Sequence, residues 1–454
     1  MHKLLIANRG EIACRILRSA RALGLATVAV HSEVDQAALH VVSADQAVAL
    51  RGNTARESYL DVEQLLAAAR ASGADALHPG YGFLAENADF ARAVQAAGLT
   101  WVGPAPETID AMGDKVRSRA IARAAGVPLL PGSERLMPDA LEGLEALAET
   151  VGYPLLVKAS GGGGGIGMQR VDGPESLRKT VTGTQALAQR AFGDAGVFLE
   201  RYVARARHIE IQVLGFGDGR AIHLFERECS IQRRFQKIVE ESPSTALTPG
   251  LRQRMADAAV ALARAQRYAG VGTVEFVFDD ERGEFHFLEM NTRIQVEHPV
   301  TELLTGLDLV ALQLRLAAGE AIALTQADVQ ARGHAIEVRL CAENPAKNYL
   351  PATGCLERLD FPPASAGLRV DTGVRSGDRI SHFYDPMIAK LIVHGEDRPQ
   401  AIARMAQALE GTVVQGPASN LALLRQVLLH PAFVAGRTHT SFLAEHRGAL
   451  LDGA

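Results

Sequence analysis

Residues 272–280 read GTVEFVFDD and residues 284–291 read EFHFLEMN, and these two runs decide the fold at the centre of the chain. Both are rich in β-branched and aromatic residues, which are enriched in strands. Only residues 281–283 separate them, and that short loop ends in glycine. The pattern predicts an antiparallel β-hairpin.

The predicted hairpin brings two carboxylates face to face. If the turn centres on Arg282, Glu275 lies opposite Glu289, with Cβ atoms about 4.5 to 5.5 Å apart. Opposed carboxylates are destabilising unless a cation lies between them or one of them is protonated. Asn291 projects from the same face as Glu289. These oxygen-bearing side chains predict a site for Mg²⁺ or Mn²⁺, and the alternative is a solvated outer face of an edge hairpin.

The segment that follows the hairpin is where we expect the chemistry. Residues 286–300 read HFLEMNTRIQVEHPV and combine two carboxylates, two amides, an arginine and two histidines. Arg293 offers a planar fork of donors, and together with Lys237 it would bind a small oxyanion. Glu297 is then a candidate general base beside that anion. His298, which precedes a proline, is expected to have a structural role.

Composition bounds the class of protein. The chain has 454 residues, which predicts about three domains. Its net charge of −5 and pI near 6.3 argue against a nucleic-acid surface. The four cysteines form no CxxC pair, so neither a disulfide framework nor a zinc site is indicated. The first residues, MHKLLIANRGEIACRIL, are not typical of a signal peptide, and we see no long apolar run. We therefore expect a cytoplasmic protein without a membrane or nucleic-acid partner.

Three regions follow one another along the chain. Strand and helix patterns alternate over residues 1–112, which predicts a Rossmann-like parallel α/β domain. Its first strand is followed by NRGEIA rather than G-x-G-x-x-G, so nucleotide binding there is not supported. Residues 113–332 begin with a helix and hold two hairpin signals. Residues 333–446 combine short strands with two helices, which predicts an α+β domain.

A glycine-rich loop lies in the second region. Residues 160–170 read SGGGGGIGMQR and expose many backbone N–H groups with little steric restraint, as a flap over phosphate oxygens requires. It is not a Walker A sequence, because no Gly-Lys-Ser/Thr follows, and a flexible linker is the alternative. Lys158, at the end of the preceding apolar run, favours phosphate binding.

A charged segment, residues 226–241, reads ERECSIQRRFQKIVEE. It mixes charges of both signs at no clean amphipathic period. A solvated segment is the default interpretation, with Lys237 as the possible exception.

Several stretches together resemble one family over essentially the whole chain. They are IANRGEIACRI, HPGYGFLAEN, MGDK, VKASGGGGGIGM, RHIEIQVLG, ERECSIQRRFQK, EMNTRIQVEHPVTE and FYDPMIAKL. The chain resembles the biotin carboxylase component of biotin-dependent acyl-CoA carboxylases, which are ATP-grasp enzymes. The resemblance implies an ATP-grasp fold, with residues 131–203 as a lid over ATP. It also implies that ATP phosphorylates bicarbonate to carboxyphosphate, which delivers CO₂ to biotin.

The resemblance assigns roles by position. Glu297 would deprotonate bicarbonate, and Arg339 would stabilise the enolate-like form of biotin. Two Mg²⁺ or Mn²⁺ ions would be bound by Glu275 and Glu289 with Asn291 beside them. Bicarbonate would be held by Lys237, Arg293, Gln295 and Val296. ATP would be contacted by Lys115, Lys158, Gly163, Gly164, Gly165, Glu200, Arg201, Val203, His208 and Gln232.

Partners are implied in the same way. No methionine flanks a lysine as Met-Lys-Met, so we expect biotin to arrive on a carrier protein or domain of another polypeptide, with a carboxyltransferase subunit as the second partner. A homodimer is common in the family. Acetyl-, propionyl- and methylcrotonyl-CoA all remain open as the final acceptor.

Two other functions compete with this one. A different ATP-grasp ligase, joining an amine to a carboxylate, would share the metal and phosphate machinery. A nucleotide-binding scaffold without turnover is the second. Its only support is that Ile166 and Phe235 stand where the family often carries polar residues, as Arg201 stands where lysine is common.

Overall fold

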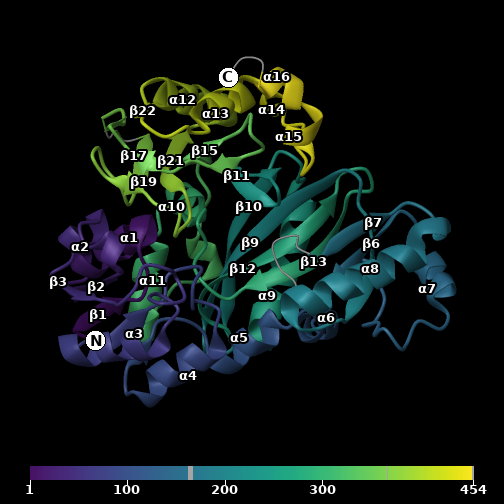
Figure 1. Cartoon of the computed structure of the whole chain (residues 1–454), viewed down its shortest axis with the longest axis horizontal. Coiled ribbons are helices and arrows are strands. Elements are labelled where there is room, and N and C mark those ends of the chain that lie inside the picture. The colour runs from purple at the N-terminus through teal and green to yellow at the C-terminus, as the bar shows by residue number, and fades with distance from the viewer. Residues whose placement is uncertain (162–166, 364, 366, 452–454) are drawn as a thin grey trace.

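The computed structural model describes residues 1–161, 167–363, 365 and 367–451 (Figure 1). The glycines predicted to contact ATP, Gly163, Gly164 and Gly165, lie outside these residues, as does Ile166. None of the described helices is both long enough and apolar enough to span a membrane.

The N-terminal part is built on a parallel five-stranded sheet, as the alternating pattern predicted, with strand order β3-β2-β1-β4-β5. Its inner strands are almost wholly apolar, and Leu4, Leu5 and Ile6 are fully buried. The elements are β1 Lys3–Ile6, α1 Gly10–Ala22, β2 Ala26–His31, η1 Glu33–Asp35, α2 Leu39–Ser43, β3 Gln46–Ala49, α3 Val62–Ser72, β4 Ala76–His78, α4 Ala88–Ala96, β5 Thr100–Trp101, α5 Pro106–Gly113 and α6 Lys115–Ala124.

A smaller three-stranded sheet, in the order β7-β6-β8, forms the part at the right of Figure 1. Its apolar face packs against two helices and has its own core, which includes Leu155, Val157 and Leu199. The elements are α7 Leu144–Val151, β6 Leu155–Ala159, β7 Met168–Val171, α8 Pro174–Phe192 and β8 Val197–Arg201.

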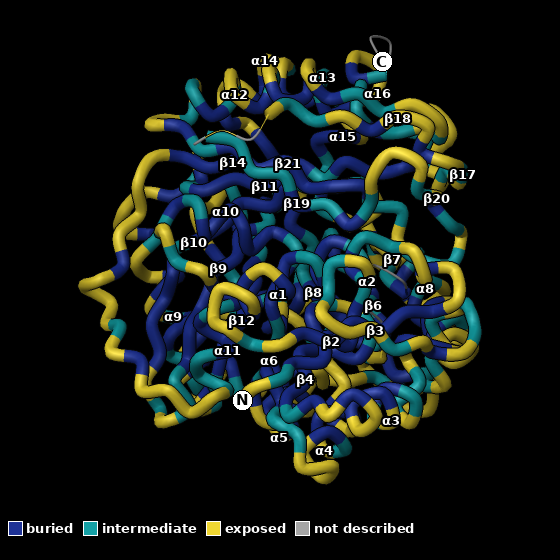
Figure 2. The backbone as a smooth tube through the Cα atoms, turned by 90° about the vertical axis from the view of Figure 1, so that its left-hand side faces the viewer, coloured by how far each residue is buried: buried dark blue, intermediate teal, exposed yellow. Residues whose placement is uncertain are grey.

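The centre of the molecule is an antiparallel eight-stranded sheet with the order β13-β12-β9-β10-β11-β14-β21-β19. Figure 2 shows most of its backbone as buried. The central elements are β9 Ala206–Phe216, β10 Ala221–Arg233, β11 Gln236–Ser242, α9 Pro249–Ala265, β12 Ala269–Asp279, β13 Glu284–Asn291, α10 His298–Thr305, α11 Leu309–Ala317 and η2 Gln326–Asp328.

The strands after residue 333 complete this same sheet. Val338 of β14 pairs with Val239 of β11, so the predicted boundary at residue 332 falls between two hydrogen-bonded neighbours. The remaining elements are β14 His334–Cys341, β15 Glu343–Asn344, β16 Leu350–Pro351, β17 Gly354–Cys355, β18 Arg358–Asp360, β19 Leu368–Thr372, β20 Arg379–Ile380, β21 Met387–Gly395, α12 Arg398–Glu410, β22 Val413–Gln415, α13 Leu421–Leu429, α14 Pro431–Val434, α15 Phe442–Glu445 and α16 Arg447–Leu451.

The β12–β13 hairpin confirms the pairing of Glu275 with Glu289. The predicted turn was wrong by half a residue, because Asp279 pairs with Glu284 and the loop holds residues 280–283. A register shift next to Glu275 leaves Leu288 unpaired as a β-bulge, and the extra residue restores the predicted pairing beyond it.

Candidate active site

Two cavities meet where the central sheet, the three-stranded sheet β7-β6-β8 of the expected lid and the N-terminal part come together. The one beneath the lid has a volume of about 330 Å³ and the one beside the N-terminal part about 510 Å³. They share a wall made by Gln236, Lys237, Arg293, Val296 and Arg339. A group transferred across this wall would pass these side chains.

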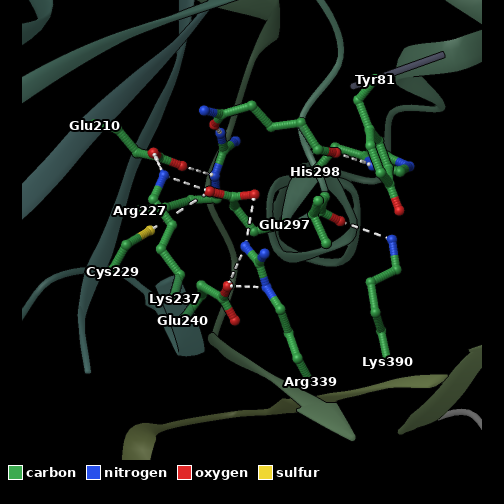
Figure 3. A network of polar contacts seen from close by, with 12 residues as sticks. Tyr81, Glu210, Arg227, Cys229, Lys237, Glu240, Glu297, His298, Arg339 and Lys390 are labelled. Carbon is green, nitrogen blue, oxygen red and sulfur yellow. Dashed lines mark hydrogen bonds and ion pairs between the residues drawn. The ribbon is translucent and has the colours of Figure 1, made fainter. Parts of the chain in front are cut away.

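Lys237 on β11 lies at the centre of this wall and is surrounded by carboxylates. Its Nζ lies 2.6 Å from Glu210 Oε2 and 2.6 Å from Glu297 Oε1 (Figure 3). It also lies 2.9 Å from Glu275 Oε1. Burial disfavours the charged form, yet the three carboxylates raise the pKa of Lys237 well above its usual value. The three carboxylates thus favour the charged ammonium, as an anion-binding group requires.

Glu297 is placed between two cations at the start of a helix. Its Oε2 accepts a hydrogen bond of 3.1 Å from Arg339 Nη2, on the side opposite Lys237. Burial opposes its ionisation, but Lys237, Arg339 and Arg227 lower the pKa of Glu297 below the usual range. The residue is also the N-cap of α10, where the helix dipole favours negative charge. Glu297 is thus held as a carboxylate.

Arg339 is shared between Glu297 and a second buried carboxylate that the sequence analysis did not identify. Its Nε donates to Glu240 Oε1 over 2.6 Å (Figure 3). Burial raises the pKa of Glu240 to about 7, against the opposing effect of Arg339. Glu240 therefore holds the guanidinium more firmly at alkaline than at acidic pH.

The prediction that residues 226–241 form a solvated segment is wrong. They form β10 and β11, two inner strands whose charged side chains are largely buried. Arg227 is completely inaccessible, and its Nε donates to Glu210 Oε1 over 2.6 Å while Nη2 donates to Gln295 Oε1 over 2.7 Å. The mixture of both charge signs was compatible with buried pairing, but no sequence periodicity distinguished the two cases.

Arg227 also determines which way the Gln295 amide points. Because Gln295 Oε1 accepts from Arg227, its Nε2 faces the cavity and donates to Glu275 Oε1 over 2.7 Å. The donor end of this amide is therefore presented to the site.

The predicted metal donors lie together at the lid side of the site. Glu275 is 4% exposed, so the solvated alternative is wrong for this residue, although β13 is an edge strand. Glu289 is an exposed residue, as the solvated alternative expected, and its place on the cavity wall and the facing Glu275 raise its pKa. Asn291 Nδ2 donates to Glu275 Oε1 over 2.9 Å. Two facing carboxylates that repel each other, with a nearby amide, fit a hard divalent cation.

A second group of potential ligands overlaps with this one. His208, Glu210 and Glu275 bring one ligand atom each within 4.8 Å of one another. The two groups share Glu275, and Glu210 is already paired with both Arg227 and Lys237.

Arg293 is oriented by a residue that the sequence analysis did not single out. Its Nε donates to Glu86 Oε2 over 2.8 Å, and its Nη2 donates to Asn291 Oδ1 over 2.7 Å. Glu86 belongs to the HPGYGFLAEN stretch of the N-terminal part, which could have suggested a role. Arg293 and Lys237 line both cavities, as the predicted oxyanion site requires.

Comparison with known proteins covers the whole chain. The family models described as "Biotin carboxylase, N-terminal domain", "Carbamoyl-phosphate synthase L chain, ATP binding domain" and "Biotin carboxylase C-terminal domain" match residues 1–109, 114–325 and 337–445. Biotin carboxylase 1 of Bacillus subtilis is 48% identical over 441 residues, which cover 97% of this chain and 98% of that protein. The chain belongs to the biotin carboxylase family.

Two further relatives are similar to this biotin carboxylase over nearly its whole length. Methylcrotonoyl-CoA carboxylase subunit alpha of Oryza sativa is 48% identical over the full chain, which spans only 61% of that protein. The biotin carboxylase domain dimer of Hydrogenobacter thermophilus 2-oxoglutarate carboxylase, solved with MgADP, ADP and bicarbonate, has a TM-score of 0.94 at 43% identity and covers 99% of this chain and 98% of that one. The chain is thus an ATP-dependent ligase that carboxylates biotin with bicarbonate and Mg²⁺.

The ATP residues predicted for this biotin carboxylase fall into two groups. Five of them line the cavity beneath the lid: Lys115, Lys158, Glu200, His208 and Gln232. Lys158 pairs with Glu200, which also accepts a 2.8 Å hydrogen bond from Arg119, a residue absent from the sequence prediction.

Arg201 and Val203 do not line that cavity. The Arg201 side chain instead donates to the carbonyl of Val151 over 3.1 Å. Their contact with the adenine stays a prediction.

Proposed function

We propose that this biotin carboxylase holds bicarbonate on the wall shared by the two cavities. ATP would bind beneath the lid, and biotin would enter the larger cavity. The observation that carries this proposal is Lys237, an ammonium held within 2.9 Å of three carboxylate oxygens between the two cavities. Such a cation, with the Arg293 fork beside it, suits a small planar oxyanion.

Binding of bicarbonate would make Glu297 a stronger base. Glu297 is a weak base while it accepts hydrogen bonds from both Lys237 and Arg339. A bicarbonate anion that draws Lys237 away removes part of this stabilisation, so the pKa of Glu297 rises and the carboxylate can take the bicarbonate proton. The deprotonated oxygen then attacks the terminal phosphorus of ATP, giving carboxyphosphate and ADP.

Divalent metal and cationic side chains would neutralise the charge of the transferred group. Mg²⁺ or Mn²⁺ bound to Glu275 and Glu289, with Asn291 beside them, would offset charge on the ATP phosphates. Lys115 and Lys158 line the same cavity and would contact those phosphates. Gln295, whose donor end faces the site, and the backbone of Val296 would complete the bicarbonate contacts.

Carboxyl transfer would take place in the larger cavity. Arg339 lines both cavities, so its guanidinium can stabilise negative charge on the ureido oxygen of biotin when N1 is deprotonated. Phosphate released with CO₂ would accept that proton.

The partners and units belong to the same proposal. Biotin would be presented by a carrier protein or domain, and carboxybiotin would be used by a carboxyltransferase in the cytoplasm, with two copies of this chain forming a dimer. Residues 1–112, 113–332 and 333–446 would act as the three units of the enzyme. The final acyl-CoA acceptor would be chosen by the carboxyltransferase.

The test is ATP hydrolysis with Mg²⁺, measured with bicarbonate and free biotin and with each omitted. Release of phosphate that needs both substrates, with carboxybiotin as the product, is the expected result. Hydrolysis indifferent to bicarbonate but dependent on an amine and a carboxylate would instead indicate a different ATP-grasp ligase. Absence of turnover with both free biotin and a biotinylated carrier domain would indicate an inactive scaffold.

A further inference from the structure

Residues 292–297 join β13 to α10 and are called here the bicarbonate loop. The last strands of the central sheet carry a row of charged side chains beneath this loop. Arg339 of β14 pairs in register with Lys390 of β21, and Lys390 pairs with Asp371 of β19. Residues paired in this way project from the same face of a sheet. Helix α10, which Glu297 caps, packs on β14 and β21.

The two neighbouring cations of this row reach two consecutive residues of the loop. Arg339 donates to the Glu297 side chain, whereas Lys390 Nζ donates to the backbone carbonyl of Val296 over 2.7 Å (Figure 3). Lys390 is completely buried. An ammonium that deep is retained only with charged or hydrogen-bonded partners, and one of its partners is a backbone atom of the active site.

The other partner of Lys390 comes from the N-terminal part. Its Nζ lies 3.2 Å from Glu11 Oε2, at the start of α1, and the hydroxyl of Tyr81 donates to the other oxygen of Glu11. A Cβ atom added at Gly373 would lie 2.4 Å from the backbone nitrogen of Glu11, so these elements pack backbone to backbone. Glu11 therefore packs against the end of β19, the strand that pairs with β21.

We propose that Lys390 is a positioning residue for carboxylation, which fixes the Val296 peptide as Arg339 fixes the Glu297 carboxylate. The hydrogen bond from Lys390 fixes the plane of the peptide between Val296 and Glu297, and hence the orientation of the Val296 backbone that we place against bicarbonate. Tyr81 also lines the larger cavity, so the Tyr81–Glu11–Lys390 chain joins the proposed biotin cavity to the bicarbonate loop. This inference rests on the bicarbonate role proposed above for Val296.

The test is Lys390→Met, which keeps the length of the side chain and removes the donor. Because small displacements of a reacting group are costly, we expect KM for bicarbonate to rise about tenfold or more and kcat to fall. KM for ATP should stay within about twofold, since the ATP contacts lie on other elements. Hydrogen exchange of residues 293–298 should accelerate selectively, which general loss of stability would not produce.

Arg375→Gln is the matched control. Arg375 also joins the C-terminal strands to the N-terminal part, through a 2.9 Å bond to the carbonyl of Ala37, but it lines neither cavity. Its KM for bicarbonate should equal that of the wild type. If Lys390→Met does not fold, Lys390→Arg, which keeps the charge but displaces the donor, should raise KM for bicarbonate about threefold.

The outcomes separate this inference from the proposed function. Wild-type enzyme whose ATP hydrolysis ignores bicarbonate would overturn the proposed function itself. Bicarbonate-dependent wild-type enzyme together with unchanged KM for bicarbonate in both folded Lys390 variants would overturn only the positioning role. A rise equal to that of Arg375→Gln would also overturn it.

Discussion

The two largest sheets of this enzyme differ in whether their strands bury charged side chains. The inner strands of the parallel N-terminal sheet bury Leu4, Leu5 and Ile6. The antiparallel central sheet buries Arg227, Glu240 and Lys390 just as deeply, since each of them is 0% exposed. Burying a charge costs free energy unless it is paired, so the second sheet contains charges that packing alone does not require. The comparison teaches that the chemistry lies where stability has been compromised.

The largest expected effect is a loss of activity when a functional charge of the central sheet is removed. Glu297→Gln removes the proposed base without changing the size of the side chain, so kcat should fall by about 10²- to 10⁴-fold. Glu241→Gln is the control, because Glu241 is a buried carboxylate of the same sheet that pairs with Arg398 and His334 and lines neither cavity. Steady-state kinetics of both variants decide this. Equal losses of kcat would contradict a special role for Glu297.

The cost of buried charge is tested next with Arg227→Met. This variant leaves Glu210 buried without one of its two cations, so the free energy of unfolding should fall by about 3 to 5 kcal/mol. Adding Glu210→Gln removes the uncompensated charge and should recover part of the loss. Urea-induced unfolding of the single and double variants measures both the loss of stability and its partial recovery. A double variant no more stable than the single one would contradict the charge explanation.

The apolar sheet provides the complementary test. Leu5→Ala creates a cavity in the N-terminal core and should lower the free energy of unfolding by about 3 kcal/mol. Within the described strands of this sheet, no residue lines either cavity, so KM and kcat per folded molecule should be unchanged. Urea-induced unfolding and steady-state kinetics on the same preparation test this prediction. A selective rise in KM for bicarbonate would contradict the view that this sheet contributes only to stability.

The smallest effect concerns pH. Burial raises the pKa of Glu240 to about 7, so this carboxyl becomes protonated as the pH falls through neutrality. The ion pair with Arg339 then weakens, and kcat/KM for biotin should decline by about tenfold per pH unit on the acidic side. In Glu240→Gln this decline should disappear between pH 6 and 8. A profile identical to that of the wild type would assign the ionisation to another group.

Prediction from the sequence succeeded where the deciding contacts are local. The β12–β13 hairpin follows from strand-forming runs around a short glycine-containing loop, and the Glu275–Glu289 pair follows from it. Even there, the bulge at Leu288 could not be foreseen, because it depends on how the edge strand fits its neighbour. The family resemblance gave the site residues their roles, which no local pattern could do.

Prediction failed where strands distant in the sequence become neighbours. Residues 226–241 resemble a solvated segment until β9 and β14 cover both edges of their strands and pair their charges. Likewise, nothing local indicates that Lys390 is adjacent to Arg339, or that Glu86 and Glu11 orient residues more than two hundred positions away.

Sequence alone was enough for the family, the parallel N-terminal sheet, the hairpin that carries the proposed metal ligands and the choice of the proposed base. These depend on residue types and short spacings, which the chain carries in every conformation. The tertiary structure alone decided which charges are buried, which carboxylate shares Arg339, and which lysine holds the Val296 carbonyl. Those outcomes depend on sheet order and register, because the burial and pairing of a charge are set by neighbours that only the folded chain brings together.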